Sequence, residues 1–167
     1  MKTHLRYPIV ERDMPAMVQL LRDFLAMTPY GALFPPPEGY HEVLIHHVLD
    51  QGGVIILACE DETERPVGAI AGVMTRHILT SQPYCDEVMW FVEPEARPTG
   101  CGLQLLVALE GFATSNGATL LRMAAPAESP VGKLLERNGY ARLETSFMKM
   151  LSRPTVQEAI SIPAAPE

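Results

Sequence analysis

The sequence predicts a single α/β (α+β) domain, built on a mixed, mostly antiparallel sheet with helices on both faces. With 167 residues, of which 47% are hydrophobic, the chain has the size of one domain and can fill one core. Segments with strand and helix character follow each other in the order β-α-α-β-β-β-α-β-α-β. A glycine-rich turn leads from the fourth predicted strand directly into a long helix.

The N-terminal third contains one strand and two helices. Residues 5–10 can form a strand, and Asp13 is expected to cap a helix whose apolar positions keep helical spacing. Residues 28–39 include Pro29 and a run of three prolines, so we expect them to form a loop and no regular helix. A second helix at about residues 38–51 is expected to end at the glycine pair that follows it.

The middle of the chain supplies most of the sheet. Residues 54–59 and 67–74 are apolar runs joined by a charged turn, which predicts an antiparallel hairpin. The fourth strand, at residues 88–92, consists of β-branched, aromatic and long apolar residues. Pro94 ends it, because proline cannot donate to a strand ladder. The helix after the glycine turn is expected to reach about residue 115.

The C-terminal part continues the alternation. A strand at residues 119–124 is expected to follow the long helix as a parallel crossover, and a short helix at residues 129–138 comes next. Residues 140–151 supply one or two final strands, so the predicted domain comprises residues 1–151. Residues 152–167 are rich in proline and alanine, and we expect them to form a mobile tail.

The turn between the fourth strand and the long helix has the properties of a phosphate site. Gly100 and Gly102 allow a positive φ or a close approach of the backbone, and the helix that begins there presents unpaired N–H groups. Arg97 adds a permanent charge and donors that match phosphate oxygens. A dinucleotide fingerprint is excluded because Leu105 stands at its third glycine, and the residues after Gly102 do not continue a Walker loop. An ordinary strand-to-helix turn is the alternative.

The segment from Arg97 to Gly102 resembles the acyl-CoA signature of the GNAT superfamily of N-acetyltransferases. That signature is Arg or Gln, two residues, Gly, any residue, then Gly or Ala, and the element order over about residues 4–151 is similar to that of the family. The resemblance implies that the turn holds the CoA pyrophosphate, while the preceding strand separates from its neighbour and offers main-chain groups to pantetheine. The residues implied are Phe91, Val92 and Glu93 for pantetheine, and Arg97, Pro98, Thr99, Gly100, Cys101 and Gly102 for pyrophosphate.

By the same resemblance, the protein is expected to move an acetyl group from acetyl-CoA, as co-substrate, directly to a primary amine of a small molecule or peptide. Many family members have a tyrosine that protonates the departing thiolate, and Leu135 occupies that position here. Ser129 replaces an asparagine and retains a hydroxyl for the pantetheine. Two alternatives stay open: a catalytically idle acyl-CoA sensor or assembly module, and a different transferase or nucleotide binder that uses the same turn.

Acetyl transfer to an amine requires a base, because the amine must lose a proton. Glu87 and Asp86 precede the apolar run of the fourth strand, where burial raises the pKa of a carboxylate. Strand alternation places Glu87 on the face of Met89 and Phe91, and Glu87 is the first candidate. Asp86 is the second, because a bulge in this strand would change which of the two faces the cleft. A solvated carboxylate at the start of a strand is the alternative for either residue.

Cysteine and histidine residues give weaker signals. Cys101 stands at a helix N-terminus, which lowers the pKa of a thiol, but no histidine has a spacing that implies pairing with it. We therefore interpret Cys101 as a small packing residue, and we expect it, Cys59 and Cys85 to be free thiols. Adjacent His46 and His47 point in different helical directions, so no metal site is expected.

Net charge limits the classes of partner. The formal net charge of -7 argues against a general nucleic-acid or membrane-surface binder, since both need an excess of Lys and Arg, and it favours cationic partners. The N-terminal segment is too polar for a signal peptide, and no apolar run approaches the ~18 residues of a membrane span. We expect a soluble, cytoplasmic protein and leave a homodimer open.

Overall fold

The computed structural model describes residues 1–126 and 129–146. The chain divides into two units, Met1–Ala127 and Glu128–Glu167, and both the sheet and the glycine-rich turn belong to the first. The prediction of one domain over residues 1–151 stays a prediction. The predicted tail at residues 152–167 lies outside the described residues.

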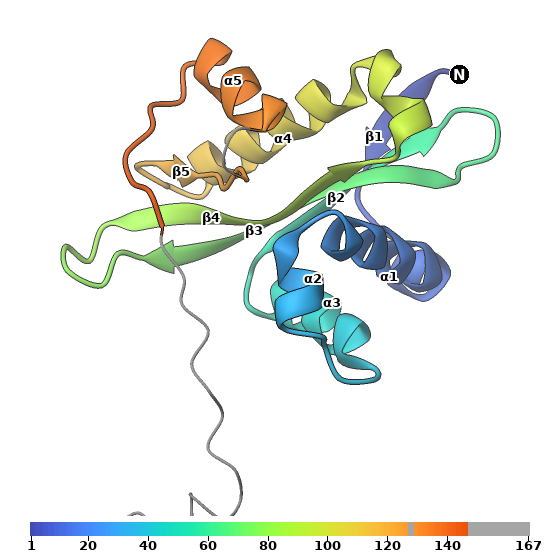
Figure 1. Cartoon of the computed structure of the whole chain (residues 1–167), viewed down its shortest axis with the longest axis horizontal. Coiled ribbons are helices and arrows are strands. Elements are labelled where there is room, and N and C mark those ends of the chain that lie inside the picture. Colours follow the sequence, from blue (N-terminus) through green and yellow to red (C-terminus); the bar gives the residue numbers. More distant parts are fainter. Residues whose placement is uncertain (127–128, 147–167) are drawn as a thin grey trace, which may run out of the picture. The chain divides into compact units, whose positions relative to one another are not determined.

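The first unit contains a five-stranded sheet in the order β1-β2-β3-β4-β5 (Figure 1). The strands are β1 (Thr3–Arg6), β2 (Val54–Glu60), β3 (Pro66–Arg76), β4 (Pro83–Val92) and β5 (Leu121–Arg122). Neighbours are antiparallel from β1 through β4, whereas β5 is parallel to β4. The predicted hairpin and the mixed, mostly antiparallel sheet are therefore confirmed.

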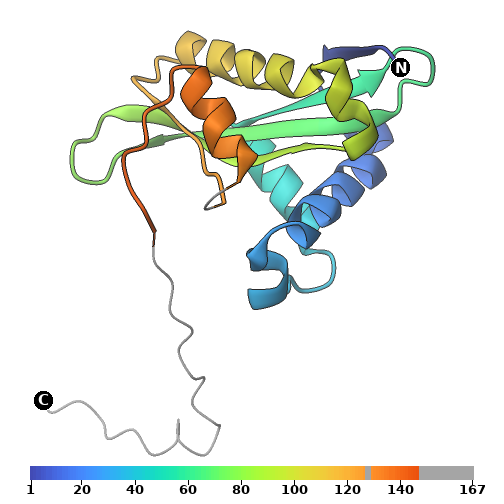
Figure 2. The ribbon, with the colours of Figure 1, turned by 45° about the horizontal axis from the view of Figure 1, so that its top comes forward.

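Helices cover both faces of this sheet (Figure 2). One face carries α1 (Val10–Ala26) and α3 (Tyr40–Asp50), whose apolar residues pack against alternate residues of β2, β3 and β4 in one buried cluster. The other face carries α4 (Cys101–Ser115), which begins directly after the turn. A Cβ at Gly72 would lie 2.7 Å from Leu109 Cδ1, so this glycine allows α4 to approach β3 closely.

The chain between α1 and α3 contains a short helix, α2 (Pro29–Leu33), where the sequence predicts a loop. Pro29 is the first residue of α2, a position whose N–H has no partner in a helix, so proline is tolerated there. A Cβ at Gly31 would lie 2.6 Å from the Leu25 carbonyl oxygen, which shows how closely α2 packs on the end of α1. The three prolines that follow lie outside any helix, as expected.

Helix α1 begins at Val10, three residues before the predicted cap, because Asp13 stabilises its first turn from within. The Asp13 carboxylate, 3% exposed, accepts hydrogen bonds from the Ile9 N–H at 2.7 Å, from Arg6 Nη1 at 2.6 Å and from Arg12 Nε at 3.0 Å. Burial opposes ionisation, but these donors outweigh it and hold the Asp13 pKa well below its usual range. Asp13 thereby joins β1 to α1.

The second unit contains α5 (Pro130–Arg137). Residues 140–146 form no strand, since no ladder partner pairs with them in the described part of the chain, and residues 147–151 lie outside it. The final strand predicted at residues 140–151 is therefore absent from its first seven positions. β5 is also shorter than the predicted strand at residues 119–124.

Asp13→Asn is expected to lower the free energy of unfolding by ~3–5 kcal/mol at pH 7, because Arg6 loses its buried carboxylate partner and keeps only the exposed Glu64. Chemical denaturation would measure the loss, with Asp50→Asn, an exposed acid at the end of α3, as the control. The pKa of Asp13 is lowered on folding, so its contribution is complete above the unfolded value of ~3.9 and declines as the pH falls below it. An equal loss at pH 7 and pH 2.5 would contradict this assignment.

Candidate functional site

The edge of β4 that faces β5 is open over most of its length. The two strands pair only at Cys85 with Leu121 and at Asp86 with Arg122. From Glu87 to Val92, the described residues provide no ladder partner on that side. The strands thus separate immediately after Asp86, as the resemblance implied.

Main-chain groups on this open edge come from alternate residues. The Glu93 N–H donates to the Val67 carbonyl oxygen on β3 at 2.9 Å. Hydrogen-bonded pairs alternate along an antiparallel ladder, so the main-chain groups of Phe91 also face β3, whereas those of Trp90 and Val92 face the open edge. Of the three residues predicted for pantetheine, Val92 alone therefore has outward main-chain groups. The side chains of Phe91 and Glu93 line a pocket on the α1 side.

The glycine-rich turn adjoins the end of this edge. Residues 94–99 form the 3-10 helix η1 (Pro94–Thr99), and Gly100 has a φ of 79°, a left-handed conformation that favours glycine. Among the described residues, the Gly102 N–H has no acceptor outside its own helix. A Cβ at Gly102 would lie 3.6 Å from Val92 Cγ2, which is ordinary contact, so Ala fits there and larger side chains crowd the strand.

Thr99 and Cys101 have structural roles in the turn. The Thr99 hydroxyl donates to the Ala96 carbonyl oxygen at 2.7 Å and accepts the Cys101 N–H at 3.3 Å. The Cys101 side chain is 0% exposed, and its Sγ faces the same carbonyl at 3.7 Å. This burial agrees with a packing residue and disfavours a nucleophile. Pro98 lies inside η1 and has no N–H to offer.

Arg97 extends from the turn toward the open edge and the end of α1. Its Nε donates to the Val92 carbonyl oxygen at 3.1 Å, and its Nη2 lies 3.7 Å from Met27 Sδ. Within the described chain, no acceptor is found for its Nη1. The guanidinium therefore places a charge and a free donor beside the turn.

A bulge in β4 decides where the two candidate carboxylates lie. Ala71 pairs with Met89 and Gly72 with Glu87, so β4 contains one additional residue, Val88. Val88 and Met89 both pack on the α1 side, and directly paired residues share a face, so Glu87 lies with Gly72 on the α4 face. Simple alternation would place Glu87 with Met89 instead.

Glu87 and Asp86 have different environments. Glu87 Oε2 accepts the Ala124 N–H at 3.3 Å, and the side chain is partly buried. Burial raises the pKa of Glu87 to about 7, against the effect of that N–H and with a contribution from the Asp86 charge. Asp86 instead forms a two-point ion pair with Arg122, at 2.7 Å to Nε and 2.6 Å to Nη2. Glu87 is the one of the two suited to proton exchange near neutral pH.

Residues of the second unit contribute two further observations. Ser129 precedes α5, and its hydroxyl oxygen is buried without a hydrogen-bond partner among the described residues. Its predicted bond to pantetheine stays a prediction. Leu135, which occupies the position of the family's tyrosine, is buried, as is usual for an apolar side chain.

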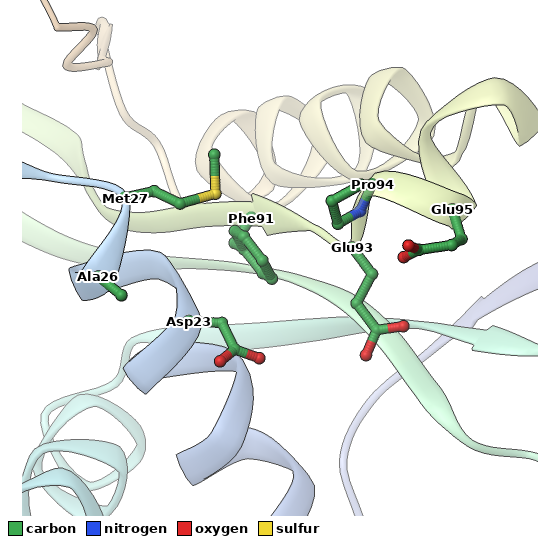
Figure 3. Close-up of a pocket in the computed structure, with 7 residues that line it drawn as sticks. All are labelled: Asp23, Ala26, Met27, Phe91, Glu93, Pro94 and Glu95. Atoms are coloured by element: carbon green, nitrogen blue, oxygen red, sulfur yellow. The ribbon is translucent and has the colours of Figure 1, made fainter.

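Sequence reasoning missed a pocket of about 470 Å³ between the C-terminal end of α1 and the end of β4 (Figure 3). No motif marks it, because its lining comes from two segments far apart in the chain. Its lining residues are Asp23, Ala26, Met27, Phe91, Glu93, Pro94 and Glu95.

The described residues contain neither a metal-binding cluster nor a membrane-spanning helix. No group of three or more His, Cys, Asp or Glu side chains in the described ranges is arranged to hold a metal ion. None of the helices in that part of the chain is long and apolar enough to cross a membrane.

The chain matches the family described as Acetyltransferase (GNAT) family over residues 16–140. No curated protein matches it. Many solved structures share the fold, among them the following three. A putative acetyl transferase from Pyrococcus furiosus is 21% identical, with a TM-score of 0.73 over 90% of this chain and 100% of that one. An aminoglycoside antibiotic 6'-N-acetyltransferase from Acinetobacter baumannii is 18% identical, with a TM-score of 0.69 over 90% and 99%. AAC(6')-Iy in complex with a CoA bisubstrate analog is 16% identical, with a TM-score of 0.72 over 92% and 100%.

The raised pKa of Glu87 predicts a pH dependence of stability. Ionising Glu87 costs more in the folded state than in the unfolded state, so its contribution to stability is lost as the pH rises from ~4.5 to about 7. The free energy of unfolding of the wild type, compared with that of Glu87→Gln, should therefore fall between pH 5 and pH 8. Denaturation of both proteins at the two pH values measures this, with Glu62→Gln on the β2–β3 turn as control. An unchanged difference between wild type and Glu87→Gln would show that Glu87 has an ordinary pKa.

Proposed function

The chain belongs to the acetyltransferase (GNAT) family and is an acyltransferase, and we propose that it moves an acetyl group from acetyl-CoA directly to a primary amine. The observation that carries this proposal is the position of Glu87. Its carboxylate, with a pKa of about 7, stands where β4 and β5 separate, at the inner end of an open strand edge. The glycine-rich turn from Arg97 to Gly102 lies at the other end of the same edge.

The free groups along this edge fit acetyl-CoA. Main-chain groups of Trp90 and Val92 would pair with the pantetheine amides, and the Gly102 N–H and Arg97 Nη1 would hold the pyrophosphate. Arg97 Nε already donates to the Val92 carbonyl oxygen. A pantetheine amide that binds the same oxygen would therefore either share it with Arg97 or displace Arg97 from it. The cofactor supplies an activated thioester; orientation and proton transfer belong to the protein.

Glu87 would take the proton that the acceptor amine loses, directly or through water, because a base with a pKa near the working pH is the most effective one. The neutral amine then attacks the thioester carbonyl, the C–N bond forms and the C–S bond breaks. A main-chain N–H on the open edge of β4 that pantetheine leaves free would stabilise the developing oxyanion. With Leu135 in place of the family's tyrosine, the sulfur would leave as a thiolate, and the second proton that the nitrogen loses as the amide forms would go to that thiolate or to water.

Binding of acetyl-CoA should depend on the turn. Gly102→Val is expected to weaken binding strongly, since its γ-methyl groups crowd Val92 at the strand edge, whereas Gly102→Ala should bind nearly as the wild type does. Arg97→Ala should bind more weakly as well, through loss of a charge from the pyrophosphate. Isothermal titration with acetyl-CoA measures all three affinities. Wild-type affinity in both Gly102→Val and Arg97→Ala would place the cofactor elsewhere.

Turnover should depend on Glu87. Glu87→Gln keeps the shape but cannot accept a proton, so turnover of an amine panel should fall by ~100-fold or more near pH 7 while acetyl-CoA affinity holds. Higher pH should partly rescue this variant by supplying neutral amine. Asp86→Asn should retain the wild-type pH profile, because Asp86 is engaged with Arg122.

Two outcomes would count against this mechanism. A wild-type rate and pH profile in Glu87→Gln would exclude Glu87 as the base. Tight acetyl-CoA binding by the wild type without turnover of any amine would instead favour the catalytically idle acyl-CoA-binding module.

A further inference from the structure

The Trp90 side chain lies on the α4 face of β4, beside the open edge. Its neighbours in the strand, Met89 and Phe91, both belong to the buried cluster on the α1 side, so Trp90 points the other way. Its ladder partner Ile70 shares that face, because directly paired residues do. Glu87 lies on the same face, so Trp90 stands between the proposed base and the end of the strand.

The indole ring of Trp90 reaches the glycine-rich turn. A Cβ placed at Gly102 would lie 4.0 Å from Trp90 Cζ2, a carbon bonded to the ring carbon that carries Nε1. The edge of the ring that bears the N–H is therefore near the turn. The Gly102 N–H, which has no acceptor outside its own helix among the described residues, belongs to the same turn. A strand and a helix thus bring two donors to one place.

The indole N–H is unused within the described chain. No acceptor for it is found there, and the side chain is only partly buried. Tryptophan combines a large apolar ring with a donor, and a buried indole N–H usually has a hydrogen-bond partner. A ligand on the open edge would cover the ring and could supply the acceptor.

The order of groups along the edge favours a ligand with an uncharged body and an anionic end. The ring gives apolar surface beside the strand, and its N–H lies toward the turn, where the Arg97 charge and the Gly102 N–H also favour an anion. A pantetheine arm that ends in a phosphate has its groups in this order. A free phosphate would use the turn alone and would leave the ring uncovered.

We propose that Trp90 is a binding residue for phosphopantetheine. Its ring forms the α4-side wall of the path of the arm, and its N–H donates to the phosphate end. This inference rests on the proposed function for the path of the arm along β4, but the contact is measurable without any turnover.

Two probes that differ by one phosphate test the role of the N–H. Pantetheine and 4′-phosphopantetheine share the arm, and only the second carries a phosphate. Trp90→Phe keeps an aromatic ring and removes the N–H. In isothermal titration this variant should bind 4′-phosphopantetheine about tenfold more weakly or worse, with a much smaller loss for pantetheine. Tyr84→Phe, which removes one donor from a partly buried ring at the other end of β4, should leave both affinities unchanged.

Fluorescence adds a readout that a purely structural role would not move. Trp90 is the single tryptophan of the chain, so the tryptophan emission reports on this ring alone. Saturation of the wild type with 4′-phosphopantetheine or acetyl-CoA should change that emission. Unchanged emission at saturation would overturn the inference, and so would equal losses of affinity for the two probes in Trp90→Phe.

The two proposals fail in different ways. Wild-type affinity of Trp90→Phe for 4′-phosphopantetheine, together with turnover of an amine, would remove the inference and leave the acetyltransferase proposal intact. Binding of 4′-phosphopantetheine that depends on Trp90, without turnover of any amine, would support the contact and remove the acetyltransferase proposal.

Discussion

The separation of β4 from β5 is the constraint on which the site depends. Two residue pairs join these parallel strands, and beyond them β4 keeps a row of unpaired main-chain groups. Unpaired strand edges are costly unless something satisfies them, and here Arg97 Nε bonds the Val92 carbonyl. An extended ligand that carries amides can complete the same edge, which is the physical basis for the proposed path of pantetheine.

One additional residue in β4 gives adjacent carboxylates different environments. Without the bulge at Val88, Glu87 would lie on the face of Met89. With it, Asp86 pairs with Arg122, while Glu87 enters partly buried surroundings with one N–H donor, from Ala124. Two carboxylates that adjoin in the chain thereby acquire different environments, one in an ion pair and one with a raised pKa. A position at the point of strand separation brings Glu87 to the inner end of the open edge.

Local chemistry was predictable from the sequence, and features that depend on pairing were not. The turn at Gly100 and Gly102 was found because positive φ and helix-start N–H groups are local properties. The face of Glu87 was not, since the bulge arises from register with β3. Asp13 was identified as a capping residue, but its buried partner Arg6 comes from a separate strand, so the helix begins earlier than expected. The pocket between the end of α1 and the end of β4 combines two distant segments, for which no sequence pattern exists.

A crystal structure of the protein with bound acetyl-CoA would show whether the open edge of β4 holds the cofactor. We expect the pyrophosphate at the turn of Arg97 to Gly102, the pantetheine amides on the main-chain groups of Trp90 and Val92, and the thioester beside Glu87. The contradicting result is a cofactor bound away from the open edge of β4, or one whose thioester lies far from the Glu87 carboxylate.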